Sequence, residues 1–137
     1  MMRKALLALA AAAIAAVPAQ AETYTASKGE AKLARALEGR VAGEPVDCID
    51  LRRIRSSRII DGTAIVYDTG RTLYVNRPES GAEALDDWDV MVVKPFSSRL
   101  CSIDTVRLHD SGSRFMNGIV FLGEFVPYDR VRTAGRR

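Results

Sequence analysis

The sequence predicts a mainly β fold, either a small antiparallel barrel or a sandwich of about six strands, with one N-terminal helix. Short β-rich runs recur at close spacing from residue 57 onward. Turn dipeptides, among them Asp61-Gly62 and Asn117-Gly118, separate several of these runs. A helical pattern occurs only near residue 30 and does not recur between the strands, which disfavours a parallel α/β sheet.

Residues 1–21 have the three-part layout of a secretory signal peptide. Arg3 and Lys4 supply the positive start, Ala5–Val17 is an apolar run of 13 residues, and Ala19-Gln20-Ala21 offers small residues for cleavage. The apolar run is shorter than the roughly 20 residues that a membrane-spanning helix needs. We therefore expect a mature N-terminus at Glu22, no membrane span after cleavage, and a periplasmic or secreted location.

The rest of the chain has the length of one domain. We expect a single β-rich domain over residues 22–128 and a basic, flexible tail over residues 129–137. The whole chain has 20 Lys and Arg against 17 Asp and Glu, but residues 22–128 have 14 against 16. A domain without a basic excess argues against a nucleic acid as partner.

The two cysteines, Cys48 and Cys101, both lie in the exported part. An even number of cysteines in an oxidising compartment predicts a disulfide. Closing such a loop would stabilise the fold by about 4 kcal/mol on the chain-entropy model. The alternative is two separate buried thiols, and a redox role is disfavoured because no C-x-x-C motif is present.

The helix is expected over about Lys28–Glu38. Ser27 and Glu30 have the spacing of a capping box, and Gly39 is suited to end the helix. Apolar residues follow the box at helical spacing: Ala31, Leu33, Ala34 and Leu37. This stripe is modest, so we expect the helix to lie against the body of the domain.

Two strand pairs are predicted by turn signals. Strands are expected over Ser57–Ile60, Thr63–Tyr67 and Thr72–Asn76, with turns at Asp61-Gly62 and Asp68-Thr69-Gly70. Later in the chain, Asn117-Gly118 predicts a hairpin turn between Phe115-Met116 and Ile119–Leu122.

The segment between these pairs is less regular. Glu79–Asp87 is expected to be a loop or one helical turn around Ala84 and Leu85. Val90–Val93 is a continuous apolar run, which predicts a strand covered on both faces. Val106–His109 alternates as a half-buried strand does.

His109 is the one histidine of the chain and hence the first candidate for catalysis. A catalytic triad needs a carboxylate on one side of the imidazole and a nucleophile on the other. Asp110 is its neighbour, but adjacent residues of a strand point to opposite faces. Ser111 and Ser113 lie in a predicted turn without a G-x-S-x-G motif. We therefore expect a surface histidine and assign no catalytic residue.

Asp86-Asp87-Trp88-Asp89 places acidic residues on both sides of the one tryptophan. A sugar could stack on Trp88 while the carboxylates hold its hydroxyl groups; alternatively, Trp88 packs at the edge of the core. The EF-hand spacing that calcium uses is absent. Zinc is disfavoured with one histidine and two cysteines expected to pair with each other. We therefore expect no metal and no cofactor.

Arg52, Arg53, Arg55 and Arg58 form the densest basic cluster of the domain. Arginine side chains suit phosphate or carboxylate groups. Arg52, Arg55 and Arg58 are three residues apart, so a helical turn would align them, and we take them with Trp88 as candidate binding residues. The alternative is an ordinary charged face paired with neighbouring aspartates.

Four segments resemble a family of small exported proteobacterial proteins that contain a domain of unknown function. They are Gly39–Ile49, Thr72–Arg77, Leu100-Cys101 and Leu122–Tyr128, the last reading L-G-E-F-V-P-Y. Many members of that family carry further cysteines near Ser80–Ala82 and before Leu122, which this chain lacks. The resemblance implies no activity, so no functional residue is carried over.

Because no catalytic group assembles in the sequence, we expect a non-enzymatic module that binds or supports another envelope component, either a protein or a glycan. One alternative is a small hydrolase or glycan-acting enzyme that uses His109 or Asp86–Asp89. Another is an inhibitor of an exported enzyme that presents a rigid loop such as Glu79–Trp88.

Overall fold

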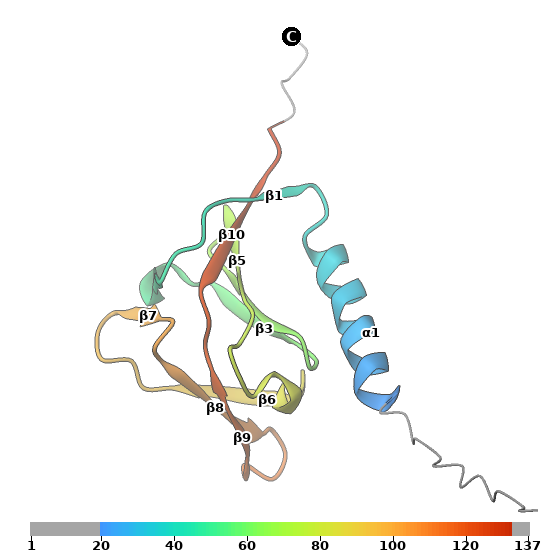
Figure 1. The fold of residues 1–137 in the computed structure, drawn as a ribbon. Coiled ribbons are helices and arrows are strands. Elements are labelled where there is room, and N and C mark those ends of the chain that lie inside the picture. The colour runs from blue at the N-terminus through green and yellow to red at the C-terminus, as the bar shows by residue number, and fades with distance from the viewer. Residues whose placement is uncertain (1–19, 133–137) are drawn as a thin grey trace, which may run out of the picture.

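A computed structural model describes residues 20–132. The predicted signal peptide, apart from Gln20 and Ala21, and the end of the predicted tail, residues 133–137, lie outside the described residues. Within this range the protein is mainly β, with antiparallel sheets and a single α-helix, as the sequence predicts (Figure 1).

The described chain contains one α-helix, two short 3₁₀ helices and ten strands. In chain order they are α1 (Gln20–Ala36), β1 (Arg40–Ala42), β2 (Cys48–Asp50), η1 (Leu51–Arg53), β3 (Ser56–Ile60), β4 (Ala64–Asp68), β5 (Thr72–Asn76), η2 (Ala82–Ala84), β6 (Asp89–Val93), β7 (Arg99–Cys101), β8 (Thr105–Asp110), β9 (Met116–Phe121) and β10 (Phe125–Arg130). The number of strands exceeds the predicted six because β1, β2 and β7 are only three residues long and carry little periodicity.

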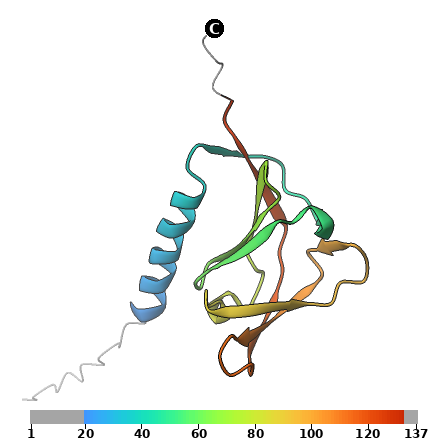
Figure 2. The same cartoon turned by 180° about the vertical axis from the view of Figure 1, so that it is seen from behind.

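The strands form three antiparallel sheets, none of which closes into a barrel. The largest has the order β1-β10-β5-β4-β3, the second is the pair β2-β7, and the third has the order β6-β8-β9. The helix α1 stands beside the large sheet at the β3–β4 hairpin, and the two smaller sheets lie away from it (Figures 1 and 2).

Two apolar clusters cover the two faces of the large sheet. The larger cluster joins that sheet to the smaller ones and contains Ile59, Ile65, Leu100, Leu108 and Phe125. The second lies under the helix and contains Leu33, Ile60, Val66 and Val75. Alternate residues of β3, β4 and β5 therefore serve opposite clusters, as the period of two in a strand requires. The central strand β4 is buried along almost its whole length.

The helix begins earlier than the sequence suggests. It runs over Gln20–Ala36, so Ser27 lies within the helix and cannot be its N-cap, and the predicted start near Lys28 is wrong. The predicted stop is confirmed, because Gly39 adopts a left-handed conformation with φ of 71° directly after the last turn. The S-x-x-E pattern at Ser27 does not mark the start of the helix, because the residues before Ser27 are also helical.

Four contacts hold α1 on the body. Leu33 is almost fully buried, and Gly29 lets the helix backbone approach the β3–β4 hairpin. Lys32 pairs with Asp87 at 3.0 Å, and Arg77 pairs with Glu30. The hydrogen bond from Arg77 lowers the pKa of Glu30. Exposed ion pairs of this kind contribute about 0–1 kcal/mol each, so apolar packing and close approach dominate the docking.

The β3–β4–β5 meander confirms the first group of predicted strands. Gly62 adopts φ of 58° in the β3–β4 turn, and Gly70 adopts φ of 92° in the β4–β5 turn. The first connection has three residues, because Ile60 pairs with Ala64 across it.

The second predicted hairpin turn is wrong. Asn117-Gly118 lies inside β9, and the turn between β8 and β9 is formed by residues 111–115. The Asp110 carboxylate holds that turn by accepting hydrogen bonds from the backbone of Gly112 and from Ser113. A register shift places the Asn-Gly pair at a bulge, because Leu108 opposes Gly118 while His109 opposes Met116.

Val90–Val93 forms a strand, but it is not covered on both faces. Val90 is 51% exposed and Val92 is 38% exposed, while Met91 and Val93 pack toward the core. The strand lies at an edge of the three-stranded sheet, where no helix covers its outer face. The doubly covered strand is instead β4.

The C-terminal strand reaches further than the predicted domain boundary. Asp129 and Arg130, which the sequence analysis placed in the tail, belong to β10 and pair with β1. A buried amide secures the start of this strand, because Asn76 donates to the Gly123 carbonyl at 2.6 Å and accepts from its N–H at 3.0 Å.

Replacing Gly29 by alanine tests the docking of α1. Alanine favours an isolated helix by about 1 kcal/mol over glycine. Its Cβ would, however, lie 1.8 Å from Thr63 Oγ1 and 2.7 Å from the Asp61 carbonyl oxygen. We expect Gly29→Ala to lower the free energy of unfolding by about 1–3 kcal/mol in urea denaturation. Ala34 is exposed on the same helix, so only helix propensity changes when it is replaced. Ala34→Gly should therefore lower the free energy of unfolding by about 1 kcal/mol. A gain in stability for Gly29→Ala would contradict the packing.

Replacing Tyr67 by phenylalanine tests a buried hydroxyl. Tyr67 is 4% exposed, and its hydroxyl has no hydrogen-bond partner among the described residues. We expect Tyr67→Phe to raise the free energy of unfolding by about 1 kcal/mol, because an unsatisfied polar group leaves the core. Tyr74→Phe, at a half-buried position of the adjacent strand, serves as the control.

The same variant has a pH signature. Burial raises the pKa of the Tyr67 hydroxyl above its usual value. The unfolded chain therefore releases this proton first, and the wild-type protein loses stability as the pH rises above about 10. Tyr67→Phe should lose less stability in that range, and equal pH profiles for the two proteins would contradict the burial of the hydroxyl.

Candidate functional site

The strongest candidate site is a cleft lined by arginines at one end of the large sheet. Two pockets adjoin there and share Arg71 and Thr72. The smaller has a volume of about 270 Å³ and also presents Arg53 and Arg99. The larger, of about 690 Å³, also presents Arg130 and Arg132. We call these two pockets together the arginine cleft.

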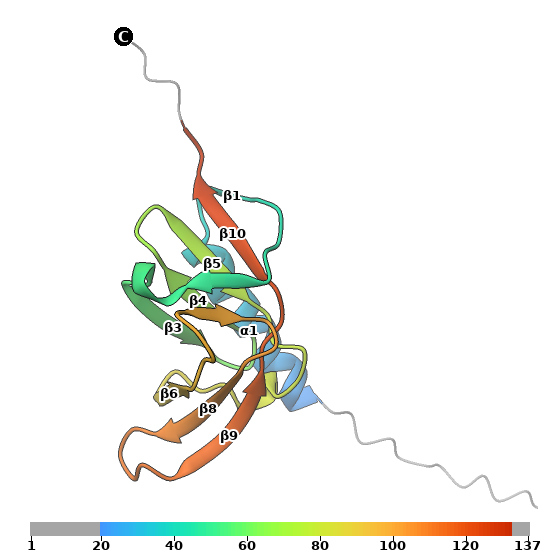
Figure 3. The ribbon, with the colours of Figure 1, turned by 90° about the vertical axis from the view of Figure 1, so that its left-hand side faces the viewer.

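Three parts of the fold meet around this cleft. Arg71 lies in the β4–β5 turn, Arg53 and Arg99 come from the segment around the β2–β7 pair, and Arg130 ends β10. The β4–β5 turn stands beside η1 (Figure 3). Residues from four distant stretches of the chain therefore line one cleft.

The β4–β5 turn is held in place by its own hydrogen bonds. Asp68 accepts from the Gly70 N–H at 2.6 Å, and Thr69 donates its hydroxyl to the Thr72 carbonyl at 2.9 Å. Arg55 packs its guanidinium over Gly70, where a Cβ would lie 2.7 Å from the guanidinium carbon. Arg40 donates to the Arg71 carbonyl at 3.2 Å. The backbone that carries Arg71 is therefore fixed before any ligand binds.

The cleft carries an excess of positive charge. Among residues 20–132, none of its five arginines forms an ion pair with a carboxylate. Two carboxylates also line it, and each already has a partner. Asp50 accepts from the Arg52 N–H at 2.9 Å and pairs with the Arg52 side chain at 3.4 Å, which together lower the pKa of Asp50. Asp129 accepts a hydrogen bond from the Thr72 hydroxyl.

The predicted arginine candidates separate in the structure. Only Leu51–Arg53 is helical, so the expected alignment of Arg52, Arg55 and Arg58 on one helical turn is wrong. Arg52 and Arg55 support the edge of the cleft through Asp50 and Gly70. Arg58 lies in β3 opposite Val66, on the face of the large sheet that packs against α1. It lines a separate pocket.

Trp88 does not pack at the edge of the core. It is 76% exposed, and its backbone N–H donates to the Asp86 carboxylate at 2.9 Å. The indole is therefore free for contact with a ligand, although it lies on the β6 side of the fold and does not line the arginine cleft.

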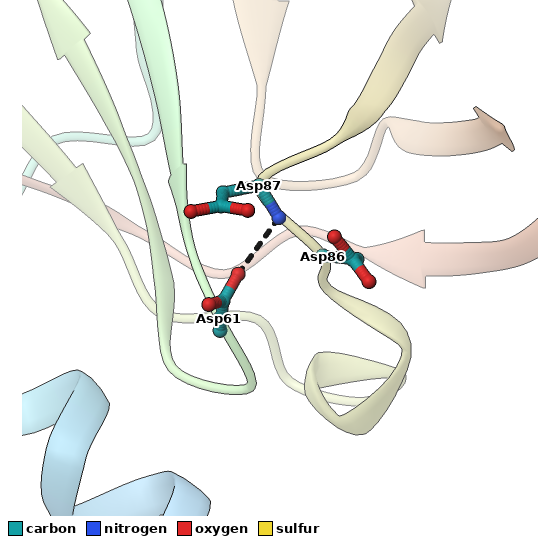
Figure 4. A group of neighbouring side chains, drawn as sticks. All are labelled: Asp61, Asp86 and Asp87. Atoms are coloured by element: carbon teal, nitrogen blue, oxygen red, sulfur yellow. Dashed lines mark hydrogen bonds between the residues drawn. The ribbon is translucent and has the colours of Figure 1, made fainter. Parts of the chain in front are cut away.

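Asp86 and Asp87 come close to Asp61 from the β3–β4 turn (Figure 4). One carboxylate oxygen of each lies within 4.8 Å of the others. The Asp87 N–H donates to Asp61 at 2.7 Å, and the Lys32 ammonium pairs with Asp87. These contacts join the β3–β4 turn, the segment before β6 and the helix. Calcium takes about six to eight oxygen ligands, so we assign no metal to this group.

Within residues 20–132, the hydrogen bond found for the His109 side chain is to a backbone carbonyl and not to a nucleophile. The His109 Nδ1 lies 3.2 Å from the Arg114 carbonyl oxygen across the β8–β9 hairpin. Asp110 uses its carboxylate to hold the turn, and its hydrogen bonds with Ser113 lower the pKa of Asp110. The neighbouring serine therefore serves the turn rather than the imidazole.

The predicted disulfide is present. Cys48 and Cys101 are bonded to each other and lie directly opposite in the β2–β7 pair, 53 residues apart in sequence. Cys48 also lines the smaller pocket, and Arg99 donates to the Cys48 carbonyl at 3.4 Å. The bridge therefore holds the part of the cleft that carries Arg53 and Arg99.

The sequence analysis identified the arginine cluster around Arg53 and missed the other arginines that line the cleft. Arg71 and Arg99 are isolated in the sequence, Arg130 and Arg132 belong to the predicted basic tail, and nothing local marks the four as a set. The one available signal was the disulfide, since a bond between residues 48 and 101 must bring Arg99 near the cluster around Arg53.

Comparison with known proteins adds no identification. No family model, curated protein or solved structure matches the chain. Within residues 20–132, no helix is both long and apolar enough to cross a membrane.

The disulfide gives a prediction for stability. Replacing both cysteines by alanine should lower the free energy of unfolding by about 4 kcal/mol, because the unfolded chain regains the entropy of an open loop. Thiol alkylation of the protein purified from the periplasm should label no site before reduction and two sites after it. Labelling without reductant, or an unchanged urea midpoint in the double variant, would contradict this role.

Proposed function

We propose that the protein is an exported, non-enzymatic binding module of the bacterial envelope and that it recognises an acidic partner through the arginine cleft. The proposal is carried by one observation: five arginines, none of which forms an ion pair within residues 20–132, line two adjoining pockets against two carboxylates. The signal-peptide pattern of residues 1–21 and the bonded cysteine pair support export.

The chemistry of the cleft favours binding over catalysis. Arginine stays protonated at physiological pH and only donates hydrogen bonds, so it holds anions but does not act as a base. The cysteine that lines the cleft is in a disulfide and is not a nucleophile. The two lining carboxylates, Asp50 and Asp129, already accept hydrogen bonds from neighbouring groups.

A polyanion binding assay tests the proposal. The protein without its signal peptide should bind dextran sulfate, and the affinity should fall as salt rises, because released counterions contribute to the binding free energy. Arg71→Ala and Arg99→Ala should each weaken the binding by about tenfold. The readout is titration calorimetry at several salt concentrations.

Arg107→Ala is the matched control. Arg107 is an exposed arginine of β8, does not line the cleft and changes the net charge by the same amount. Its loss should leave the affinity nearly unchanged, as should His109→Ala and Asp89→Ala at the residues of the alternative enzyme hypothesis. An equal loss for Arg107→Ala, or no binding by the wild-type protein, would refute the cleft as the binding site.

A further inference from the structure

The smaller pocket collects guanidinium groups that the sequence keeps apart. Arg53 follows β2 in η1, Arg71 lies between β4 and β5, and Arg99 opens β7. Arginines that are neighbours in the sequence lie close together simply because the chain joins them. Here three separate segments each bring one arginine to the same pocket, which has a volume of about 270 Å³. Holding like charges together costs free energy, which an anion in the pocket would offset.

The hydrogen-bond donors that remain in this pocket come from the three arginines and from the Tyr74 hydroxyl. The Thr69 hydroxyl donates to the Thr72 carbonyl, and the Thr72 hydroxyl donates to Asp129. Of the three guanidiniums, only that of Arg99 has a hydrogen bond among the described residues, to the Cys48 carbonyl. A ligand group rich in acceptor atoms, with room for several donors, therefore fits this pocket.

Three guanidinium groups offer more hydrogen-bond donors than one carboxylate group can accept. A carboxylate offers two oxygens in one plane, whereas a phosphate monoester offers three terminal oxygens arranged around phosphorus and carries a charge of about −1.5 to −2 at pH 7. Donors that approach from three segments of the fold suit the second arrangement.

Both pockets contain a carboxylate: Asp50 in the smaller pocket forms an ion pair with Arg52, and Asp129 in the larger pocket forms none among residues 20–132. The larger pocket therefore differs in character. It presents Arg130 and Arg132 but also the Asp129 carboxylate, which accepts hydrogen bonds. A purely anionic ligand would be repelled by that carboxylate, whereas a sugar hydroxyl would donate to it. Its volume of about 690 Å³ falls in the range of sites for organic ligands.

We propose that the arginine cleft binds a sugar phosphate, with the phosphate monoester held by Arg53, Arg71 and Arg99 and the hydroxylated ring in the larger pocket beside Asp129. This inference rests on the proposed binding function and specifies its ligand. The phosphorylated sugar could be a free metabolite or the head group of a lipid, since both present the same chemistry.

The test compares two dianions by titration calorimetry at pH 8. Glucose 1-phosphate should bind about tenfold more tightly than malonate, which has the same charge on two planar groups. Binding of glucose 1-phosphate should weaken as the pH falls below about 6, where the phosphate dianion takes up a proton and becomes a monoanion. Dextran sulfate binding should change little over the same range, because the sulfate groups stay ionised.

Variants that keep the charge separate geometry from attraction. Arg99→Lys and Arg71→Lys retain the positive charge but lose the planar fork, so each should weaken glucose 1-phosphate by about tenfold while nearly sparing dextran sulfate. Asp129→Ala, which removes the hydrogen-bond acceptor, should reduce the preference for glucose 1-phosphate over inorganic phosphate. Urea denaturation of each variant shows that it is folded, and Arg107→Lys is the control outside the cleft.

Each outcome has one meaning. If dextran sulfate does not bind, the proposed function fails as well. If dextran sulfate binds but malonate binds as tightly as glucose 1-phosphate, the sugar phosphate assignment is overturned and the acidic partner stands. Tighter binding of a single-stranded DNA oligonucleotide, a phosphodiester, would overturn it in the same way.

Sedimentation with lipid vesicles distinguishes a lipid head group from a soluble ligand. Phosphatidylcholine vesicles that contain phosphatidylinositol 4-phosphate display a phosphate monoester on a hydroxylated ring at a surface. Sedimentation of the protein with these vesicles, and not with phosphatidylcholine alone, would assign a lipid head group. Binding of glucose 1-phosphate without sedimentation would assign a soluble ligand, and neither form of binding would overturn the proposal.

Discussion

Covering β4 on both faces is the constraint on which the rest of the structure depends. Ala64, Ile65, Val66 and Tyr67 are all buried, so the strand needs an apolar layer on each side. The helix supplies one layer through Leu33, and the two smaller sheets supply the other through residues such as Leu100 and Leu108. The remaining elements pack around this strand. The outer face of β6 takes no part in covering β4 and stays exposed.

The arginine cleft follows from how the smaller β2–β7 sheet is attached. Three residues in each strand form too few hydrogen bonds to hold a sheet by themselves, and the disulfide between Cys48 and Cys101 joins them covalently. Ile49 and Leu100 then bury their side chains against the large sheet. This attachment places Arg53 and Arg99 opposite the β4–β5 turn, where Arg71 stands on a backbone fixed by Asp68 and Arg40. A structural bond thus also shapes the candidate binding site.

Local chemistry predicted those elements whose determinants are adjacent in sequence. Gly39 ends the helix, and Gly62 and Gly70 turn the meander, because each position needs a backbone conformation that glycine adopts easily. Asn117-Gly118 failed as a turn because Asp110 offers a competing turn that its carboxylate stabilises, and because Gly118 lies against Ala84, where a Cβ would come within 2.8 Å. Val90–Val93 failed as a doubly covered strand because apolar composition does not reveal how many neighbours a strand has.

The sequence by itself determined the β class, the single helix and the meander, since each depends on spacing along the chain. It made a bond between Cys48 and Cys101 the expected one of two alternatives, and the structure decided between them. Only the tertiary structure decided which strand is central, where the second hairpin turns, and which arginines act together. Arg71, Arg99 and Arg130 are far apart in the sequence and meet only because strand pairing and the disulfide bring their segments to one end of the large sheet. Their combined charge is a property of that arrangement, because Coulomb interactions depend on distance in space and not on separation along the chain.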